Sequence, residues 1–318
     1  MKTEHRINLK GILSEYAIYF VLLTLIVAMS LLRPDHFPTW SNFTNILRQM
    51  TPVGLIALGV AFCIIAGGTN LSGGAIAALS GVVVASLVKD SNYSLAVSLL
   101  IPVLIGLCLG ALNGVMVAYG RMPPFIATLG MMNAARGLAL VYTGGLFISG
   151  LPPNFTFLGG GSLFGVPMPI VVFAICIIVA FFFLHVTRFG NHVYAVGGNE
   201  KAAVISGIDS KKVKLLAYSL AGVFSAIAGI IVAARSQSGQ PAVGEGFDLD
   251  AITCAVIGGC SMKGGIGTIH GTVIGAVFLG VLINSMTMLQ IDANWQRVVR
   301  AVIIVLALLV DMHKNRSK

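Results

Sequence analysis

Polar and charged side chains are rare in this sequence, and the few that interrupt its apolar runs are the residues that could do chemistry. Arg136 stands in the middle of the apolar run 124–142, and Asn133 lies three residues earlier on a neighbouring part of the same helical face. An ionisable group near the centre of a bilayer costs at least about 2.5–3.5 kcal/mol and usually faces a bundle interior or a cavity. Arg136 therefore either lines a polar path or anchors neighbouring helices through hydrogen bonds to carbonyl groups.

Other polar and aromatic residues with apolar neighbours extend this set. The residues that we predict to line a path are Asn70, Ser72, Asn113, Phe125, Thr128, Asn133, Arg136 and Asn284. Asn113 and Asn284 could equally form hydrogen bonds between helices. Phe125 and Thr128 could pack in the bundle, or they could offer a ring face and a hydroxyl to a sugar.

No pattern for catalysis or nucleotide binding accompanies these residues. The sequence has no GxxxxGK[ST] loop to hold nucleotide phosphates, and it has neither HExxH nor GxSxG. His185 and His270 lack a carboxylate or second histidine at ligand spacing, so no metal site is predicted. We expect a chain that is not an enzyme and that binds no cofactor itself.

The elements that position these residues follow from composition. Of the 318 residues, 57% are hydrophobic and 10% are charged, far below the roughly 25% charged residues of soluble proteins. A bilayer needs about 20 mostly apolar residues per helix, so the length predicts an all-α transmembrane bundle of about ten helices. The net charge of +9 is scattered through loops rather than clustered, which argues against nucleic acid as a partner. The expected spans lie near 16–32, 52–66, 75–88, 95–118, 124–142, 167–186, 215–234, 250–262, 266–287 and 296–312.

Three of these runs, 52–66, 75–88 and 250–262, are too short to cross alone without tilt or adjoining irregular backbone. Membranes tolerate such backbone only where it is buried in protein or faces a water-filled cavity, so we expect broken helices around a path. The pattern GGxxxxGG occurs at Gly67–Gly74 and again at Gly258–Gly265. It reflects either a duplicated half or chance recurrence in a glycine-rich chain.

The distribution of Lys and Arg predicts the orientation, because cytoplasmic loops carry the excess. With the N-terminus inside, most basic residues fall on the inner side, and the acidic residues Asp35, Asp90, Glu245, Asp248, Asp250 and Asp292 fall on the outer side. The sequence thus predicts that both ends of the chain lie in the cytoplasm. The largest inner loop, 187–214, is strongly basic.

Within that loop, Tyr194–Asp209 reads YAVGGNEKAAVISGID. We expect a turn at Gly197, Gly198 and Asn199, then a short polar helix that Glu200 opens at its positive dipole end and Gly207 closes. On these residues alone, the helix is either a linker or a docking surface.

Several stretches of the chain resemble one known family. They are the loop at 194–209, Gly67-Gly68 with Leu71-Ser72 and Gly74, the segment Phe125–Gly130 with Arg136-Gly137, and Asp248–Ile252 leading to Gly258-Gly259 and Gly264–Gly267. Their types and order resemble the ribose-type branch of bacterial ABC importer permeases, over nearly the whole chain. Family members usually carry Ile-Asp where this chain has Thr69-Asn70, so a neutral amide replaces a carboxylate.

This resemblance implies a single permease domain over 1–318 that carries a monosaccharide across the bacterial inner membrane. It implies cytoplasmic ATPase partners that bind ATP and Mg²⁺, a periplasmic or lipid-anchored sugar-binding protein, and a second permease in a homodimer or heterodimer. The loop 187–214 would be the coupling loop, with its ATPase contact at Gly197, Gly198, Asn199, Glu200, Lys201, Ala202, Ala203 and Gly207.

The main alternative is a secondary transporter driven by an ion gradient. Such a protein needs acidic residues within the membrane, and here only Asp250 and Asp311 come near the interior of a span, each close to a helix end. A membrane enzyme is disfavoured as well, because no acid–base or metal constellation is present. We therefore favour the importer subunit.

Overall fold

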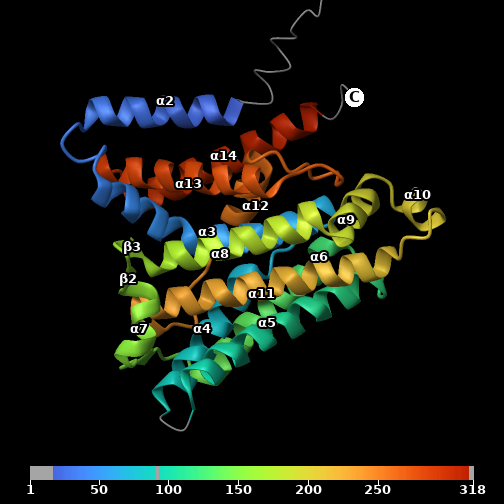
Figure 1. Ribbon diagram of the computed structural model, residues 1–318, viewed down its shortest axis with the longest axis horizontal. Coiled ribbons are helices and arrows are strands. Elements are labelled where there is room, and N and C mark those ends of the chain that lie inside the picture. Colours follow the sequence, from blue (N-terminus) through green and yellow to red (C-terminus); the bar gives the residue numbers. More distant parts are fainter. Residues whose placement is uncertain (1–16, 91–92, 315–318) are drawn as a thin grey trace, which may run out of the picture.

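Helices form most of the computed structural model, which describes residues 17–90 and 93–314 (Figure 1). The longer helices are α2 (Ala17–Leu32), α3 (Trp40–Ile65), α4 (Gly73–Lys89), α5 (Leu95–Ala118), α6 (Pro124–Thr143), α8 (Met168–Phe181), α11 (Ser210–Ser236), α13 (Ile269–Met288) and α14 (Ala293–Lys314). The shorter ones are α7 (Pro153–Gly160), the π-helix η1 (Phe182–Val186), α9 (Arg188–Gly198), α10 (Glu200–Ile205) and α12 (Phe247–Ile257). Two small antiparallel pairs join β1 (Ile148–Ser149) to β4 (Ser238–Gly239) and β2 (Ser162–Leu163) to β3 (Val166–Pro167).

Six of the described helices are long and apolar enough to cross a membrane. They are α3, α5, α6, α8 with its η1 extension, α11 and α13. Two shorter apolar helices, Ile18–Leu32 and Gly73–Lys89, accompany them. The chain is therefore a multi-pass helical membrane protein, as predicted. The number of about ten crossings and the orientation stay predictions.

The prediction of a short second span was wrong, because α3 has 26 residues and begins at Trp40. Its first turns carry polar residues that interrupt the apolar run, and Thr39 caps them by accepting a hydrogen bond from the Asn42 N–H at 3.2 Å. Pro52 lies inside the helix without ending it. By contrast, α4 has 17 residues and α12 only 11, so these two helices are short as expected.

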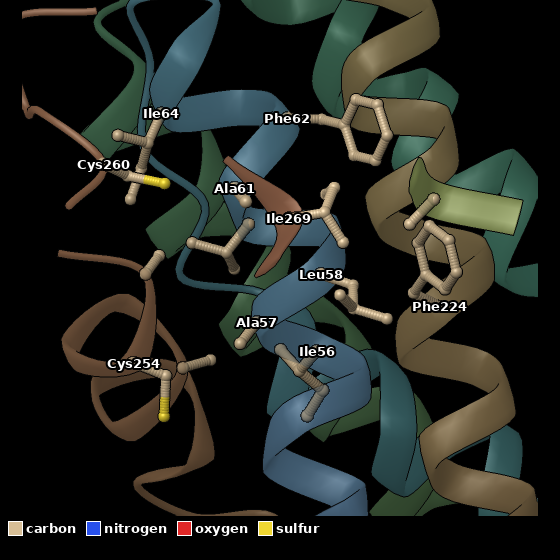
Figure 2. Close-up of a cluster of buried hydrophobic side chains, with 14 of the residues drawn as sticks. Ile56, Ala57, Leu58, Ala61, Phe62, Ile64, Phe224, Cys254, Cys260 and Ile269 are labelled. Atoms are coloured by element: carbon tan, nitrogen blue, oxygen red, sulfur yellow. The ribbon is translucent and has the colours of Figure 1, made fainter. Parts of the chain in front are cut away.

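α3 lies at the centre of the bundle, and of its residues from Met50 to Ile65 all but Val53 are buried. Figure 2 shows its side chains meeting residues of α11, α12 and α13 in one apolar cluster. Within this cluster the rings of Phe62 and Phe224 stack with centroids 6.5 Å apart. Dense packing of this kind holds the surrounding short elements in fixed positions.

Small residues bring α11 and α5 together at backbone distance. A methyl group at Gly106 would lie 2.5 Å from the Gly222 carbonyl oxygen, and one at Gly110 would lie 3.1 Å from the Gly222 Cα. Such close approach through glycine is typical of helix pairs in membranes.

The connecting elements divide between the two ends of the bundle (Figure 1). α10 and the end of α9 lie at one end, and the last described residues of α14 point toward the same end. α7 and the strands β2 and β3 lie at the opposite end. The basic residues Lys2, Arg6, Lys10, Arg316 and Lys318, which contribute to the predicted orientation, lie outside the described residues. The end that carries α10 is called the α10 end below.

Candidate functional site

Two short helices begin inside the bundle after stretches of non-helical backbone. Residues 66–72 precede α4, and residues 237–246 lead from the end of α11 to α12. The two helix starts meet, because the Asp248 carboxylate accepts a hydrogen bond from the Gly74 N–H at 2.5 Å. A carboxylate at this place satisfies a free N–H group and interacts favourably with the positive end of the α4 dipole.

Asp248 and Asp250, which the distribution of Lys and Arg predicts to lie on the outer side, are both buried. Asp248 is 5% exposed and Asp250 is 6% exposed. Arg300 of α14 forms an ion pair with Asp250 at 3.0 Å. The two acids are thus partnered in different ways, Asp248 by a backbone N–H and Asp250 by a guanidinium.

Arg136 holds the non-helical segment that leads to α12. Its guanidinium donates to the carbonyl oxygens of Pro241 at 2.8 Å and Val243 at 2.5 Å. These are the carbonyl hydrogen bonds that the sequence allowed it to make. They replace backbone partners that an irregular segment lacks inside a membrane. A place for Arg136 on a path stays a prediction.

Three of the predicted path residues meet at the start of α4. Asn70 accepts hydrogen bonds at its Oδ1 from the N–H and the hydroxyl of Ser72, at 3.0 and 2.8 Å. The Asn113 amide donates to the Ser72 hydroxyl at 2.8 Å and so brings in α5. All three side chains are fully buried. Since Asn113 is 41 residues from Ser72 in the chain, only the fold makes this network.

Besides Arg136, three predicted residues lie on α6, and they face different ways. Thr128 is buried and donates to the Pro124 carbonyl at 2.8 Å, so its hydroxyl is used within the helix. Phe125 is 57% exposed, and Asn133 is also exposed, with its amide bonded to the Leu129 carbonyl. An exposed amide on a membrane helix needs a polar neighbour beyond this chain or a wet surface.

Asn284 lies apart from this network. Its amide donates to Asn42 Oδ1 at 2.9 Å and joins α13 to the first turns of α3. Asn42 also lines an open hollow of about 410 Å³ with Asp35, His36 and Arg48. Asn284 thus forms the interhelical hydrogen bond that the sequence allowed, and its place on a path stays a prediction.

The short polar helix at the α10 end is present as predicted. α10 spans Glu200–Ile205, Asn199 caps it by accepting from the Ala202 N–H at 3.0 Å, and Gly207 follows with φ of +84°. The predicted turn was wrong in one respect, because Gly197 and Gly198 form the last turn of α9 and only Asn199 separates the two helices.

A salt bridge fixes α10 against α11. Lys214 approaches the Glu200 carboxylate at 2.7 Å, and the Lys214 side chain is only 18% exposed. Burial by itself raises the pKa of Glu200, but hydrogen bonds from Lys214 and Ser210 and the Lys214 charge outweigh it and lower that pKa. α10 therefore has a defined attachment to a long central helix.

Four glycines join α9 to two other parts of the chain, and we call this contact the glycine junction: Gly67, Gly197, Gly264 and Gly265. A methyl group at Gly264 would lie 2.7 Å from the Gly197 carbonyl oxygen and 2.9 Å from the Gly67 Cα. The Gly265 N–H donates to the Ile65 carbonyl at 2.8 Å. The two GGxxxxGG segments therefore touch each other and the end of α9.

Tyr194 strengthens the same contact from α9. Its hydroxyl donates to the Gly267 carbonyl at 2.7 Å. Burial raises the pKa of Tyr194 to about 12, so the phenol stays a donor at neutral pH. α10, α9, the 66–72 segment and the loop after α12 thus form one continuous set of contacts.

Sequence reasoning missed Asp248, Gly74 and the junction glycines as partners. No local sequence pattern predicts a contact between Gly74 and Asp248, which are 174 positions apart. Within the described residues, no group of three His, Cys, Asp or Glu side chains could hold a metal ion.

Comparison with known proteins identifies the family. Residues 42–308 match the family described as the permease component of branched-chain amino acid transport systems. The chain belongs to this family. It is a transport permease, and the family carries out transport rather than catalysis.

This permease is similar to curated proteins along its whole length. It is 42% identical to the ribose import permease protein RbsC of Bacillus subtilis, over 99% of this chain and 100% of that protein. It is 42% identical to RbsC of Escherichia coli K12 over 96% of each chain, and 35% identical to the D-allose permease AlsC of that strain over 93% of this chain and 91% of that protein. No solved structure matches. The resemblance to ribose-type permeases is confirmed.

Proposed function

We propose that this permease is the transmembrane subunit of an ATP-binding-cassette importer that carries a monosaccharide, ribose or a related sugar, into the cell. The observation that carries the proposal is the 42% identity to a ribose import permease over 99% of the chain. Relatives named for allose, arabinose and xylose transport, 32–35% identical, support the same class of neutral, hydroxyl-rich solute.

Energy comes from partner subunits in this proposal. ATPase chains bind ATP and Mg²⁺ and contact α10 and its flanks, from Gly197 to Gly207, so this chain needs no cofactor. The polar, exposed α10, tied to α11 by the Glu200–Lys214 pair, supports this assignment. Closure of the ATPases displaces α10, and the glycine junction passes the displacement to the segments that precede α4 and α13.

Solute passes along polar groups near the broken helices. The path draws on the Asn70–Ser72–Asn113 network and on the exposed face of α6, with Phe125 and Asn133. A second permease, identical or different, covers that face and completes the path. A methyl group at Gly130 or Gly137 on α6 would meet no atom within 4 Å, which leaves room for such a partner.

The proposed setting is the bacterial inner membrane, with the chain as a single permease domain. The α10 end faces the cytoplasm, both chain ends lie on that side, and about ten helices cross the bilayer. A periplasmic or lipid-anchored binding protein delivers sugar at the opposite end. Affinity resides in that protein, so the path needs only weak polar contacts.

The test is uptake of labelled ribose into vesicles that contain this permease, its ATPase and its binding protein. We expect uptake that requires ATP and stops when the ATPase is inactivated. A secondary transporter would instead show uptake that follows an ion gradient and persists without the ATPase. That result would overturn the proposal.

A further inference from the structure

The buried network at the start of α4 is incomplete. Asn70, Ser72 and Asn113 are each 0% exposed, and the Ser72 hydroxyl donates to Asn70 Oδ1 while it accepts from Asn113 Nδ2. These bonds use one atom of each amide. The other two atoms, Asn70 Nδ2 and Asn113 Oδ1, are buried and have no hydrogen-bond partner among the residues that the structure describes.

Unpaired buried polar atoms are unfavourable. Leaving such a group unsatisfied costs about 1–3 kcal/mol, and most buried polar atoms in proteins bond to protein or ordered water. Here one leftover atom is a donor and the other is an acceptor, and the same serine hydroxyl joins their side chains. A ligand that both accepts and donates through one atom would satisfy both.

A hydroxyl oxygen has this property, since it donates one proton and accepts at its lone pairs. An ammonium group only donates and an ionised carboxylate only accepts, so neither fits both atoms. We propose that Asn70 Nδ2 and Asn113 Oδ1 together bind one hydroxyl oxygen, which belongs to a water molecule or to the transported solute. The solute form of this inference rests on the proposed function.

The network lies next to the start of α4, to α11 and to the glycine junction. Ser72 directly precedes α4, whose second residue is the Gly74 that bonds Asp248. The Tyr218 hydroxyl donates to the Thr69 carbonyl at 3.0 Å and holds the 66–72 segment against α11. The same segment contains Gly67 of the glycine junction. A displacement of the junction therefore reaches the hydroxyl site through only a few residues.

The solute form is tested with the assembled importer in vesicles, at saturating binding protein. Uptake of ribose is compared with uptake of each of its mono-deoxy analogues. We expect the wild type to carry one analogue about tenfold more slowly, the effect of one lost hydrogen bond of about 1.4 kcal/mol. Asn113→Ala and Asn70→Ala should reduce that ratio to near one. Asn42→Ala, at a buried asparagine whose amide is fully paired, should keep the wild-type ratio.

Asn70→Asp is the sharper variant, because it keeps the Oδ1 acceptor for Ser72 and replaces only the free donor. It also keeps the test usable if the alanine variants do not fold. The water form is tested by electron cryomicroscopy of the sugar-free importer at a resolution that shows ordered water. Density within hydrogen-bond distance of both amide atoms in the wild type supports the water form.

The inference is overturned if the analogue ratios are the same in wild type and variants and no such density is present. The two proposals fail separately. Absence of ATP-dependent ribose uptake by the wild type would refute the importer assignment, whereas normal uptake with unchanged ratios and an empty site would refute only the hydroxyl site.

Discussion

The Asp248 carboxylate accepts a hydrogen bond from the Gly74 N–H and thereby joins the first turn of α12 to the first turn of α4. Each helix starts inside the bundle, so each exposes N–H groups that water does not reach. One side chain therefore serves a helix other than its own. This contact fixes two broken elements relative to each other.

Removing this carboxylate should destabilise the permease. Asp248→Ala leaves the Gly74 N–H unsatisfied, and a hydrogen bond to a charged group contributes about 1.5–3 kcal/mol. We expect a lower unfolding temperature in detergent, with a smaller loss in Asp248→Asn, which keeps a carbonyl acceptor. Glu245→Gln, at an exposed acid three residues away, is the control. Equal effects at 245 and 248 would contradict the role given to this contact.

Adjacent glycines at the end of α9 offer a matched pair. A methyl group at Gly197 would collide with the Ile65 carbonyl and lie 2.6 Å from the Gly265 N, whereas at Gly198 it would meet nothing within 4 Å. Gly197→Ala should therefore lower the unfolding temperature of the isolated permease, since overpacking costs about 1–3 kcal/mol. Gly198→Ala should leave it unchanged. If the two variants behave alike, the glycine junction is not a tight contact.

The Glu200–Lys214 pair should matter for coupling more than for stability. Glu200 is 48% exposed, so the pair contributes at most about 1 kcal/mol to folding. Lys214→Met should nevertheless weaken ATP-driven uptake, because α10 loses its attachment to α11. Exchanging the charges, with Glu200→Lys and Lys214→Glu together, should restore part of the uptake. Lys212→Met removes the same charge from a side chain that is 72% exposed and should have a much smaller effect.

The same pair gives a pH prediction. The folded-state pKa of Glu200 is lowered, so the stabilisation is present above the unfolded pKa, about 4.3, and is lost as pH falls through the folded value. Between roughly pH 5.5 and 7.5 the carboxylate stays ionised, so its titration should add no pH dependence to the unfolding temperature. Matching pH profiles of wild type and Glu200→Gln over that interval would support this, and a divergence that begins above pH 5 would contradict it.

Arg136 should be needed for the shape of the segment before α12. Arg136→Met removes both carbonyl hydrogen bonds to Pro241 and Val243, so residues 237–246 should exchange amide hydrogens faster in mass-spectrometric measurements. Arg136→Lys keeps one strong donor and should have an intermediate effect. Arg297→Met, at an exposed arginine on α14, should leave the exchange of this segment unchanged.

Local signals predicted the local parts of this fold. The run Asn199–Gly207 carries its own cap, dipole partner and stop, and α10 follows it closely. The start of α3 was missed because its first turns are polar, and only tertiary packing and the Thr39 cap make them helical. The burial of Asp248 was missed because a carboxylate is normally solvated by water at the surface. Here the Gly74 N–H and the α4 dipole take the place of that water. The Asn70–Ser72–Asn113 network was predicted as separate residues, since no local pattern reports a contact between α5 and the start of α4.

At the glycine junction, backbone meets backbone without a side chain between them. Side chains absorb small movements by rotating about their χ angles, and Gly67, Gly197 and Gly264 have none to rotate. At this contact no side-chain rotation can absorb a small displacement. In the importer proposed above, a displacement of α10 by the ATPases reaches the segment before α4 through these backbone contacts, with no side chain between them to take it up.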